Sequence, residues 1–153
     1  MSRLLGIDLG ARRIGLAVAD TETGDVRPLT TLRRSAPAHD CAVLARLVDE
    51  QRIDELVLGL PSNMDGTEGQ QAGATRAWAA EVLPALGLPL SWRDERLTSE
   101  RAESLLGRPR RGRSGGPPSP AARLARRSSV DREAARLILQ AELDARSRPA
   151  GSG

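Results

Sequence analysis

The segment LLGIDLGARRIGLAVAD, residues 4–20, decides the fold because it contains two short apolar runs joined by a turn. The runs cover residues 3–9 and 14–20, and Gly10 supplies the backbone freedom that a tight turn needs. This pattern predicts a β-hairpin. Asp8 lies within the first run, and charged side chains are almost never fully buried unless they are paired or bound to a cation. Asp8 therefore requires a partner elsewhere in the chain.

The rest of the chain alternates between strand and helix patterns. Residues 26–32 form an apolar run with Pro28, which favours a strand at a sheet edge. Cys41, Leu44, Ala45 and Val48 recur at helical spacing. Further along we expect a buried strand within 54–61, a helix over 70–86, a strand over 88–95, a helix over 98–106 and a last helix over 130–146. This order predicts an α/β fold with a mixed five-stranded sheet flanked by helices.

The length and charge of the chain indicate one basic domain. Its 153 residues suit a single core, which we expect over residues 1–146. All basic residues are arginine, and the formal charge of +3 suits a polyanionic partner, although a coding bias would also explain it. Residues 107–127 hold seven arginines and no acid among Gly, Pro and Ser, which predicts a mobile basic loop that contacts phosphates or is merely solvated. Residues 147–153 resemble a disordered tail.

Several classes of protein are disfavoured by the composition. A single cysteine, Cys41, cannot form an internal disulfide, and with one histidine, His39, it excludes a zinc site or a Cys/His nucleophile. No apolar stretch is long enough to span a bilayer, so we expect a cytoplasmic protein that does not bind membranes. With only two aromatic residues, Trp78 and Trp92, a stacking platform for single strands is poorly supported.

Three acidic residues are candidate neighbours of Asp8. Asp94 and Glu95 follow an apolar strand, and Asp131 lies in the first turn of the expected last helix, on the face of Ala134, Ala135, Ile138 and Leu139. Crowded carboxylates resist ionisation unless a divalent cation compensates them, and oxygen ligands suit Mg²⁺ or Mn²⁺. Two such ions, about 4 Å apart, can activate water for phosphodiester hydrolysis.

Each acidic candidate also has a structural explanation. Asp8 can pair with an arginine, and Asp94 and Glu95 can form a solvated turn or interact with a helix dipole. Asp131 also fits a variant capping box, Ser128-x-x-Asp131. The loop in GLPSNMDGTEG, residues 59–69, is either a substrate-binding loop at a strand end or a plain connection.

The chain resembles the YqgF/RuvX family of RNase H-like nucleases. The resemblance rests on GIDLGARRIGLAVAD, LVLGLPSNMDGTEG, DERLTS and SVDREAARLIL, which occur in this order over nearly the whole chain. It implies an RNase H-like fold and metal-dependent phosphodiester hydrolysis, with Asp8, Glu95 and Asp131 as the catalytic and metal-binding triad. Asp94, Asp65 or Glu68 could also join the metal site. In this fold the fifth strand is not next to the first, so Glu95 must reach across the neighbouring strand end.

The resemblance also implies a nucleic-acid substrate. The family is associated with 5′-end maturation of precursor 16S ribosomal RNA, and some members are described as Holliday junction resolvases. This chain lacks the lysine often found shortly before the Asp131 motif, and Arg126 or Arg127 takes that place. The residues predicted to bind structured RNA or branched DNA are Arg12, Arg13, Asn63, Arg96, Arg110, Arg111, Arg113, Arg126 and Arg127.

Two other functions compete with a nuclease. GIDLG also resembles the first phosphate loop of actin-like ATPases and sugar kinases, but this chain lacks the length and the second loop that would enclose a nucleotide. A non-catalytic nucleic-acid-binding or ribosome-assembly module would use the same arginines without cutting. Either a monomer or a homodimer is compatible with the sequence, and a junction resolvase would most simply be a two-fold dimer.

Overall fold

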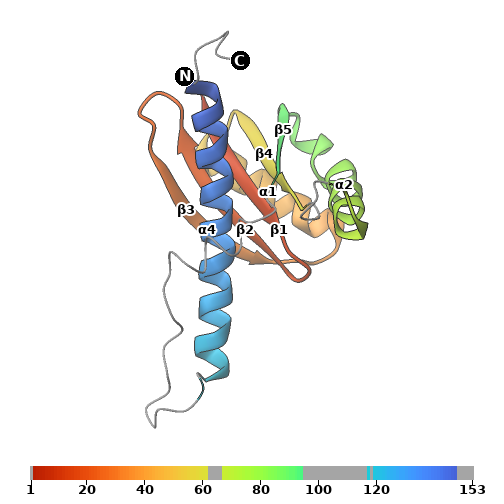
Figure 1. The fold of residues 1–153 in the computed structure, drawn as a ribbon. Coiled ribbons are helices and arrows are strands. Elements are labelled where there is room, and N and C mark those ends of the chain that lie inside the picture. The colour runs from red at the N-terminus through yellow and green to blue at the C-terminus, as the bar shows by residue number, and fades with distance from the viewer. Residues whose placement is uncertain (1, 62–66, 95–116, 118, 148–153) are drawn as a thin grey trace.

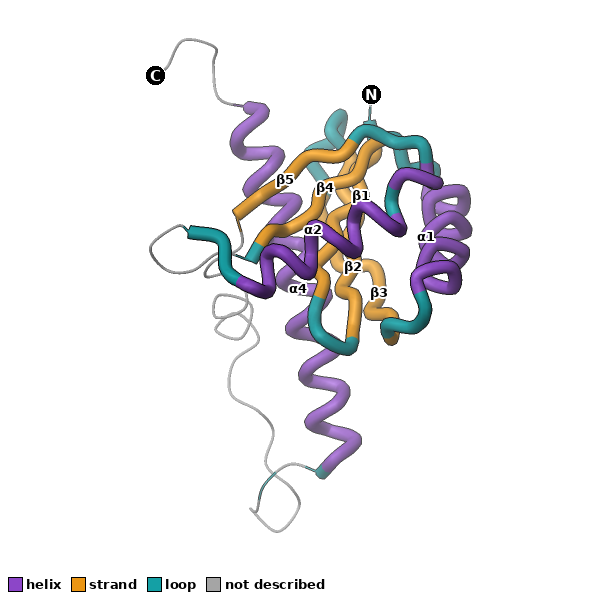
Figure 2. Tube along the Cα trace, turned by 90° about the vertical axis from the view of Figure 1, so that its right-hand side faces the viewer, coloured by secondary structure: helices purple, strands orange, loops and turns teal. Residues whose placement is uncertain are grey.

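The computed structural model describes residues 2–61, 67–94, 117 and 119–147, and shows a sheet between two helical layers (Figure 1). The elements are β1 (Arg3–Leu9), β2 (Arg13–Asp20), β3 (Val26–Arg33), α1 (Pro37–Gln51), β4 (Glu55–Leu60), α2 (Gln70–Val82), the 3₁₀ turn η1 (Pro84–Leu86), β5 (Leu90–Asp94) and α4 (Pro120–Ser147). Helices α1 and α2 cover one face, and α4 crosses the other (Figure 2).

The sheet is mixed and has the order β3-β2-β1-β4-β5. Strand β1 is antiparallel to β2 and parallel to β4, so the direction of the sheet changes at β1, and the predicted mixed sheet is confirmed. Strand β3 lies at an edge, as Pro28 predicts, and a register shift occurs where Ala17 pairs with Pro28. Functional groups gather at such switch points in open α/β sheets.

The two faces of the sheet bury different cores. Alternate β1 residues such as Leu5 and Ile7 pack towards α1 and α2, where Leu44, Trp78 and Val82 are buried. The opposite face packs on α4, and its core is smaller: Leu4, Ala17, Ala19, Val57, Ala135, Ile138 and Leu139. Small residues therefore allow α4 to approach the sheet closely.

Helix α4 is longer than the sequence analysis predicts. It begins at Pro120 rather than near Val130, so residues 120–127, predicted as part of a mobile loop, are helical. The reason lies in Ser119, whose hydroxyl oxygen accepts the Ala122 N–H at 3.1 Å, and in Pro120 at the first helical position. These start signals were obscured by the Pro-rich and Arg-rich composition of the segment. The helix also includes Ser147, which was predicted to belong to the tail.

Other predicted segments either differ from the structure or lie outside the residues that it describes. The helix predicted over 70–86 stops at Val82 and is followed by a separate 3₁₀ turn, because Pro84 has no N–H to continue it. The helix predicted over 98–106, residues 107–116 of the basic segment and residues 148–153 of the tail lie outside the described residues. In the described ranges, no helix is both long and apolar enough to cross a membrane.

Candidate active site

Asp8 lies near the C-terminal end of β1, the central strand of the sheet, and faces α4. Gly6, two residues earlier on β1, packs against Leu139 and Ala135 of α4, and strand alternation puts Asp8 on the same face. Asp8 is only 9% exposed and pairs in register with Gly15 on β2. Its carboxylate is therefore held at the switch point of the sheet, beneath the long helix.

Asp131 approaches the sheet directly above the register partner of Asp8. A Cβ atom on Gly15 would lie closer than 3.0 Å to the backbone carbonyl of Asp131, a distance that real Cβ atoms essentially never show. Gly15 therefore admits the α4 backbone at this point. Thr31, which pairs with Gly15 on the far side, also holds α4 by donating its hydroxyl to the Ser128 carbonyl at 2.6 Å. The fold thus brings the backbone of Asp131 to the strand pair that contains Asp8, although the two residues are far apart in sequence.

The capping-box interpretation of Asp131 is wrong. Because α4 begins at Pro120, both Ser128 and Asp131 lie within the helix rather than in its first turn. The predicted helical face is confirmed, since Ala134, Ala135, Ile138 and Leu139 are all buried. Asp131 therefore faces the sheet because of helical phase and not because it caps a helix end.

Arg13 forms an ion pair with Asp131. Its Nε donates to Asp131 Oδ2 at 2.6 Å, and the two side chains are 24% and 17% exposed. Arg13 was predicted to bind nucleic acid, and in the free protein its guanidinium pairs with a predicted metal ligand. Partial burial makes this pair stronger than an exposed surface pair.

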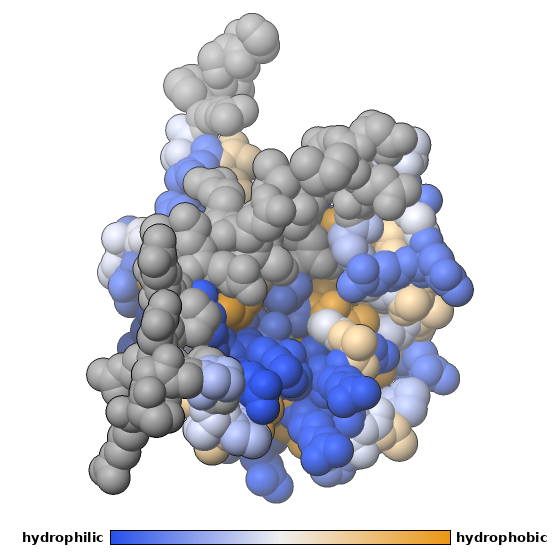
Figure 3. Space-filling model, turned by 60° about the horizontal axis from the view of Figure 1, so that its bottom comes forward, coloured by the Kyte–Doolittle hydropathy of each residue, from blue (hydrophilic) through white to orange (hydrophobic). Residues whose placement is uncertain are grey.

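Further arginines surround the end of the sheet where Asp8 lies. The β1–β2 turn is closed by the Gly10 N–H donating to the Arg13 carbonyl at 2.8 Å, and Arg34 donates from Nη1 to the Gly10 carbonyl at 2.9 Å. Arg12 and Arg33 are exposed beside this turn. Figure 3 brings this end forward and shows a concentration of hydrophilic side chains. The end of the sheet at the β1–β2 turn is therefore rich in arginine, and one of these arginines, Arg13, contacts Asp131.

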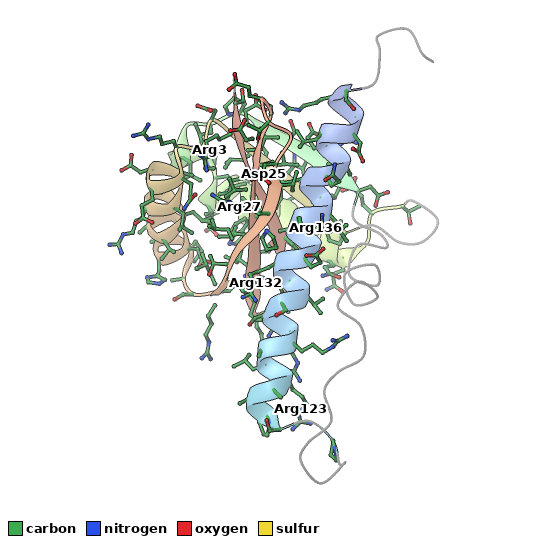
Figure 4. All side chains as sticks on the ribbon, turned by 90° about the vertical axis from the view of Figure 1, so that its left-hand side faces the viewer. Arg3, Asp25, Arg27, Arg123, Arg132 and Arg136 are labelled. Carbon is green, nitrogen blue, oxygen red and sulfur yellow. The ribbon has the colours of Figure 1, made fainter. Side chains whose placement is uncertain are left out.

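Helix α4 extends this positive surface beyond the sheet. Figure 4 shows Arg123 on the projecting part of the helix, whereas Arg132 and Arg136 lie where it crosses the sheet. Arg123 and Arg127 are exposed and Arg126 is half-buried. Ordered arginines at fixed spacing thus replace part of the predicted mobile loop.

The remaining predicted site residues are placed only in part. Asp94 is the last residue of β5, which is separated from β1 by β4, as the sequence predicts. Glu68 accepts a hydrogen bond from Arg76 at 2.6 Å, and this bond is the main cause of the lowered pKa of Glu68. The predicted residues outside the described ranges are Asn63, Asp65, Glu95, Arg96, Arg110, Arg111 and Arg113. Within the described ranges, no group of three or more His, Cys, Asp or Glu side chains is placed to hold a metal ion.

One charged cluster was missed by the sequence analysis. Glu142 of α4, 6% exposed, binds Arg93 of β5 at 2.5 Å and Arg146 at 3.2 Å, and Arg146 also binds Glu55 at 2.5 Å. Burial alone would raise the pKa of Glu142, but hydrogen bonds from the two arginines outweigh it and lower the pKa. The available signal was Glu142 itself, an acid three residues after Leu139 on the buried face. The ion pair between Arg93 and Glu142 therefore links β5, the strand that precedes Glu95, to α4.

Comparison with known proteins identifies the family. A family profile described as "RuvX: Holliday junction resolvase" matches residues 2–145. The chain belongs to the RuvX family. It is 44% identical over 145 residues to a protein from Anaeromyxobacter dehalogenans (strain 2CP-1) and 41% identical over 145 residues to one from Synechococcus elongatus; both are named "Putative pre-16S rRNA nuclease". These matches cover 95% of this chain and 98% and 91% of the two relatives.

A solved structure supports the fold. RuvC of T. thermophilus in complex with a Holliday junction substrate superposes with a TM-score of 0.54 at 17% identity, over 95% of this chain and 96% of RuvC. The predicted family and RNase H-like fold are therefore confirmed, and the RuvX membership identifies the chain as a nuclease-family enzyme.

Proposed function

We propose that this RuvX protein is a divalent-metal-dependent nuclease that matures the 5′ end of precursor 16S ribosomal RNA. The observation that carries the proposal is the close approach of α4 at Gly15, which brings Asp131 to the β1–β2 pair that contains Asp8. The names of the Anaeromyxobacter and Synechococcus relatives support the RNA substrate. Residues 1–146 would form the single catalytic domain of a cytoplasmic protein.

The donor atoms at this site fit a hard divalent cation. Asp8 and Asp131 offer only oxygen ligands, which Mg²⁺ and Mn²⁺ prefer. We assign Asp8, Asp131 and Glu95 as the catalytic and metal-binding residues, with Asp94 as a further candidate. A bound cation would supply Lewis-acid stabilisation of charge at the scissile phosphate. Glu68, an exposed residue that pairs with Arg76, is left out of this assignment.

The chain's own residues account for substrate binding. Arg12 is exposed in the β1–β2 turn, and Arg123, Arg126 and Arg127 lie on the N-terminal part of α4; we propose that a phosphate backbone contacts these residues. Asn63, Arg96, Arg110, Arg111 and Arg113 remain proposed contacts from their sequence positions. Asp8 and Asp131 are held by a strand and a helix, so their carboxylates would keep a fixed position relative to the bound phosphate.

A Holliday junction resolvase is the second candidate. The description of the RuvX family and the junction-bound RuvC structure favour it. Resolution of a four-way junction would require a homodimer with two sites on opposing strands, whereas RNA trimming is possible for a monomer. A non-catalytic binding module would explain the arginines. It would not explain why Asp8 is buried on the strand pair that the Asp131 backbone contacts.

A cleavage assay tests the proposal. The wild-type protein is incubated with Mg²⁺ or Mn²⁺ and a structured precursor-like RNA, a four-way DNA junction or a linear DNA duplex. We expect cleavage of the RNA to fall by at least about a hundredfold in Asp8→Asn, while nucleic-acid binding persists. Asp25→Asn is a matched control, because Asp25 is exposed in the β2–β3 turn, beyond the opposite end of β2 (Figure 4).

The substrates distinguish the functions. Preferential cutting of the junction would indicate that branched DNA, rather than RNA, is the substrate. Equal rates for Asp8→Asn and wild type would contradict the acidic site. Binding of all three substrates without cutting would indicate the non-catalytic module.

A further inference from the structure

The ion pair between Arg13 and Asp131 places a cation of the chain on a proposed metal ligand. Arg13 is the first residue of β2, and the alternation that turns Gly15 towards α4 turns Arg13 the same way. Its Nε contact with Asp131 Oδ2 is 2.6 Å long. The guanidinium therefore partly neutralises a carboxylate that the proposed site needs.

A guanidinium in this position opposes a divalent cation. Like charges a few ångströms apart repel, and the repulsion is only weakly screened when both side chains are partly buried, as here. A cation that engages Asp131 must therefore overcome Arg13 or displace it. The same guanidinium is a good ligand for a phosphate, since it presents several donors in one plane.

We propose that Arg13 is an exchangeable counter-ion of Asp131, which competes with the divalent cation in the free protein and moves to a backbone phosphate when nucleic acid binds. This inference rests on the proposed function, since it requires a metal site that includes Asp131. Its consequence is a positive coupling: nucleic acid tightens metal binding, and the metal tightens nucleic-acid binding by the same factor.

The packing decides which partner moves. The Asp131 backbone rests on Gly15, where not even a methyl group would fit, and Thr31 holds the preceding turn of α4. The backbone of Arg13 is also fixed, because its carbonyl accepts the Gly10 N–H. The Arg13 side chain is long and 24% exposed, so it can leave Asp131 without disturbing the fold. The exchange is therefore a side-chain rotation.

Metal titration tests the competition without any catalytic readout. The affinity for Mn²⁺ is measured by calorimetry on the full chain, in the absence of nucleic acid, at moderate salt. We expect Arg13→Gln to bind Mn²⁺ about tenfold more tightly than wild type, because one repelling charge is removed. Arg13→Met, which keeps the apolar stem, is a second charge-free variant should the first fail to fold.

Arg33→Gln is the matched control. Arg33 pairs in register with Arg13 on β3 and carries the same charge, but it is exposed and forms no ion pair with the described residues. We expect its loss to tighten Mn²⁺ binding by about twofold at most, because water and salt screen it.

A second titration tests the exchange itself. A short phosphorothioate RNA hairpin, which resists cleavage, is added at saturation, and Mn²⁺ binding to the hairpin alone is subtracted. The hairpin should tighten Mn²⁺ binding to wild type by about tenfold and to Arg13→Gln by clearly less, because the variant has no counter-ion to release.

The outcomes separate the inference from the function on which it rests. If Mn²⁺ binds wild type and is lost in Asp8→Asn, but Arg13→Gln binds no more tightly than Arg33→Gln, the competition is overturned while the metal site stands. Weaker binding in Arg13→Gln would also overturn it and make Arg13 a positioning residue for Asp131. Absence of any Mn²⁺ binding that depends on Asp8 would overturn both.

Discussion

Replacement of Gly15 by alanine should separate α4 from the sheet at the candidate site. The added Cβ would fall within 3.0 Å of the Asp131 backbone carbonyl, whereas ordinary contacts begin near 3.4 Å. A flexible side chain could rotate away from the added Cβ, but here the neighbouring atoms belong to the backbone of α4, so the helix itself must move. Ile138 and Leu139, buried against the sheet about two turns further along the helix, would loosen with it.

The expected cost follows from this geometry. Overpacking of a core costs about 1–3 kcal/mol, and a clash with backbone belongs at the upper end, so we expect about 3 kcal/mol lower stability. Urea unfolding, followed by circular dichroism, measures this loss. In folded protein the displaced Asp131 should also lower cleavage by about a hundredfold, because a shift of about 1 Å in a site has effects of this size.

Gly73→Ala is the internal control for the Gly15 variant. Gly73 is exposed in α2, and a Cβ there meets nothing within 4 Å. The same substitution should therefore stabilise the protein by about 0.5–1 kcal/mol, since alanine favours helix. The reasoning is refuted if Gly15→Ala unfolds at the urea concentration of wild type or shifts in the same direction as Gly73→Ala.

Two other contacts of α4 give further predictions. Glu142→Gln should cost about 2 kcal/mol at pH 7, because Arg93 loses its anion and Arg146 keeps only its pair with Glu55. Since the pKa of Glu142 is lowered in the folded protein, the wild-type advantage should be complete above its ordinary pKa of 4.5, decline as the pH falls below 4.5 and be lost once the pH passes the lower pKa of the folded protein. Urea titrations at several pH values would show this. A constant difference down to pH 3 would contradict it. Thr31→Val, similar in shape, should cost about 1 kcal/mol through the lost bond to the Ser128 carbonyl, and an unchanged melting temperature would show that this bond contributes nothing.

The strands and the direction of the sheet could be predicted from local patterns. The runs that became β1 and β2 are short, apolar and joined by a Gly-containing turn, and Pro28 excluded a central position for β3. Helix α4 was predicted on the correct face, because a 3.6-residue period survives any error in the helix ends. Its start was missed, because Pro and Ser occur in both loops and helix N-termini.

The sequence by itself determined that Asp8 lies within a buried strand, that Asp131 faces a core and that the chain belongs among RNase H-like nucleases. These conclusions depend on periodicity and motifs, which are local properties. Only the tertiary structure decided that Asp131 rests on Gly15 and pairs with Arg13, 118 positions away in the chain. From the sequence, any of the 23 arginines could have been that partner. Arg13 is the partner because α4 packs directly on the backbone of β2 at Gly15, two residues from Arg13.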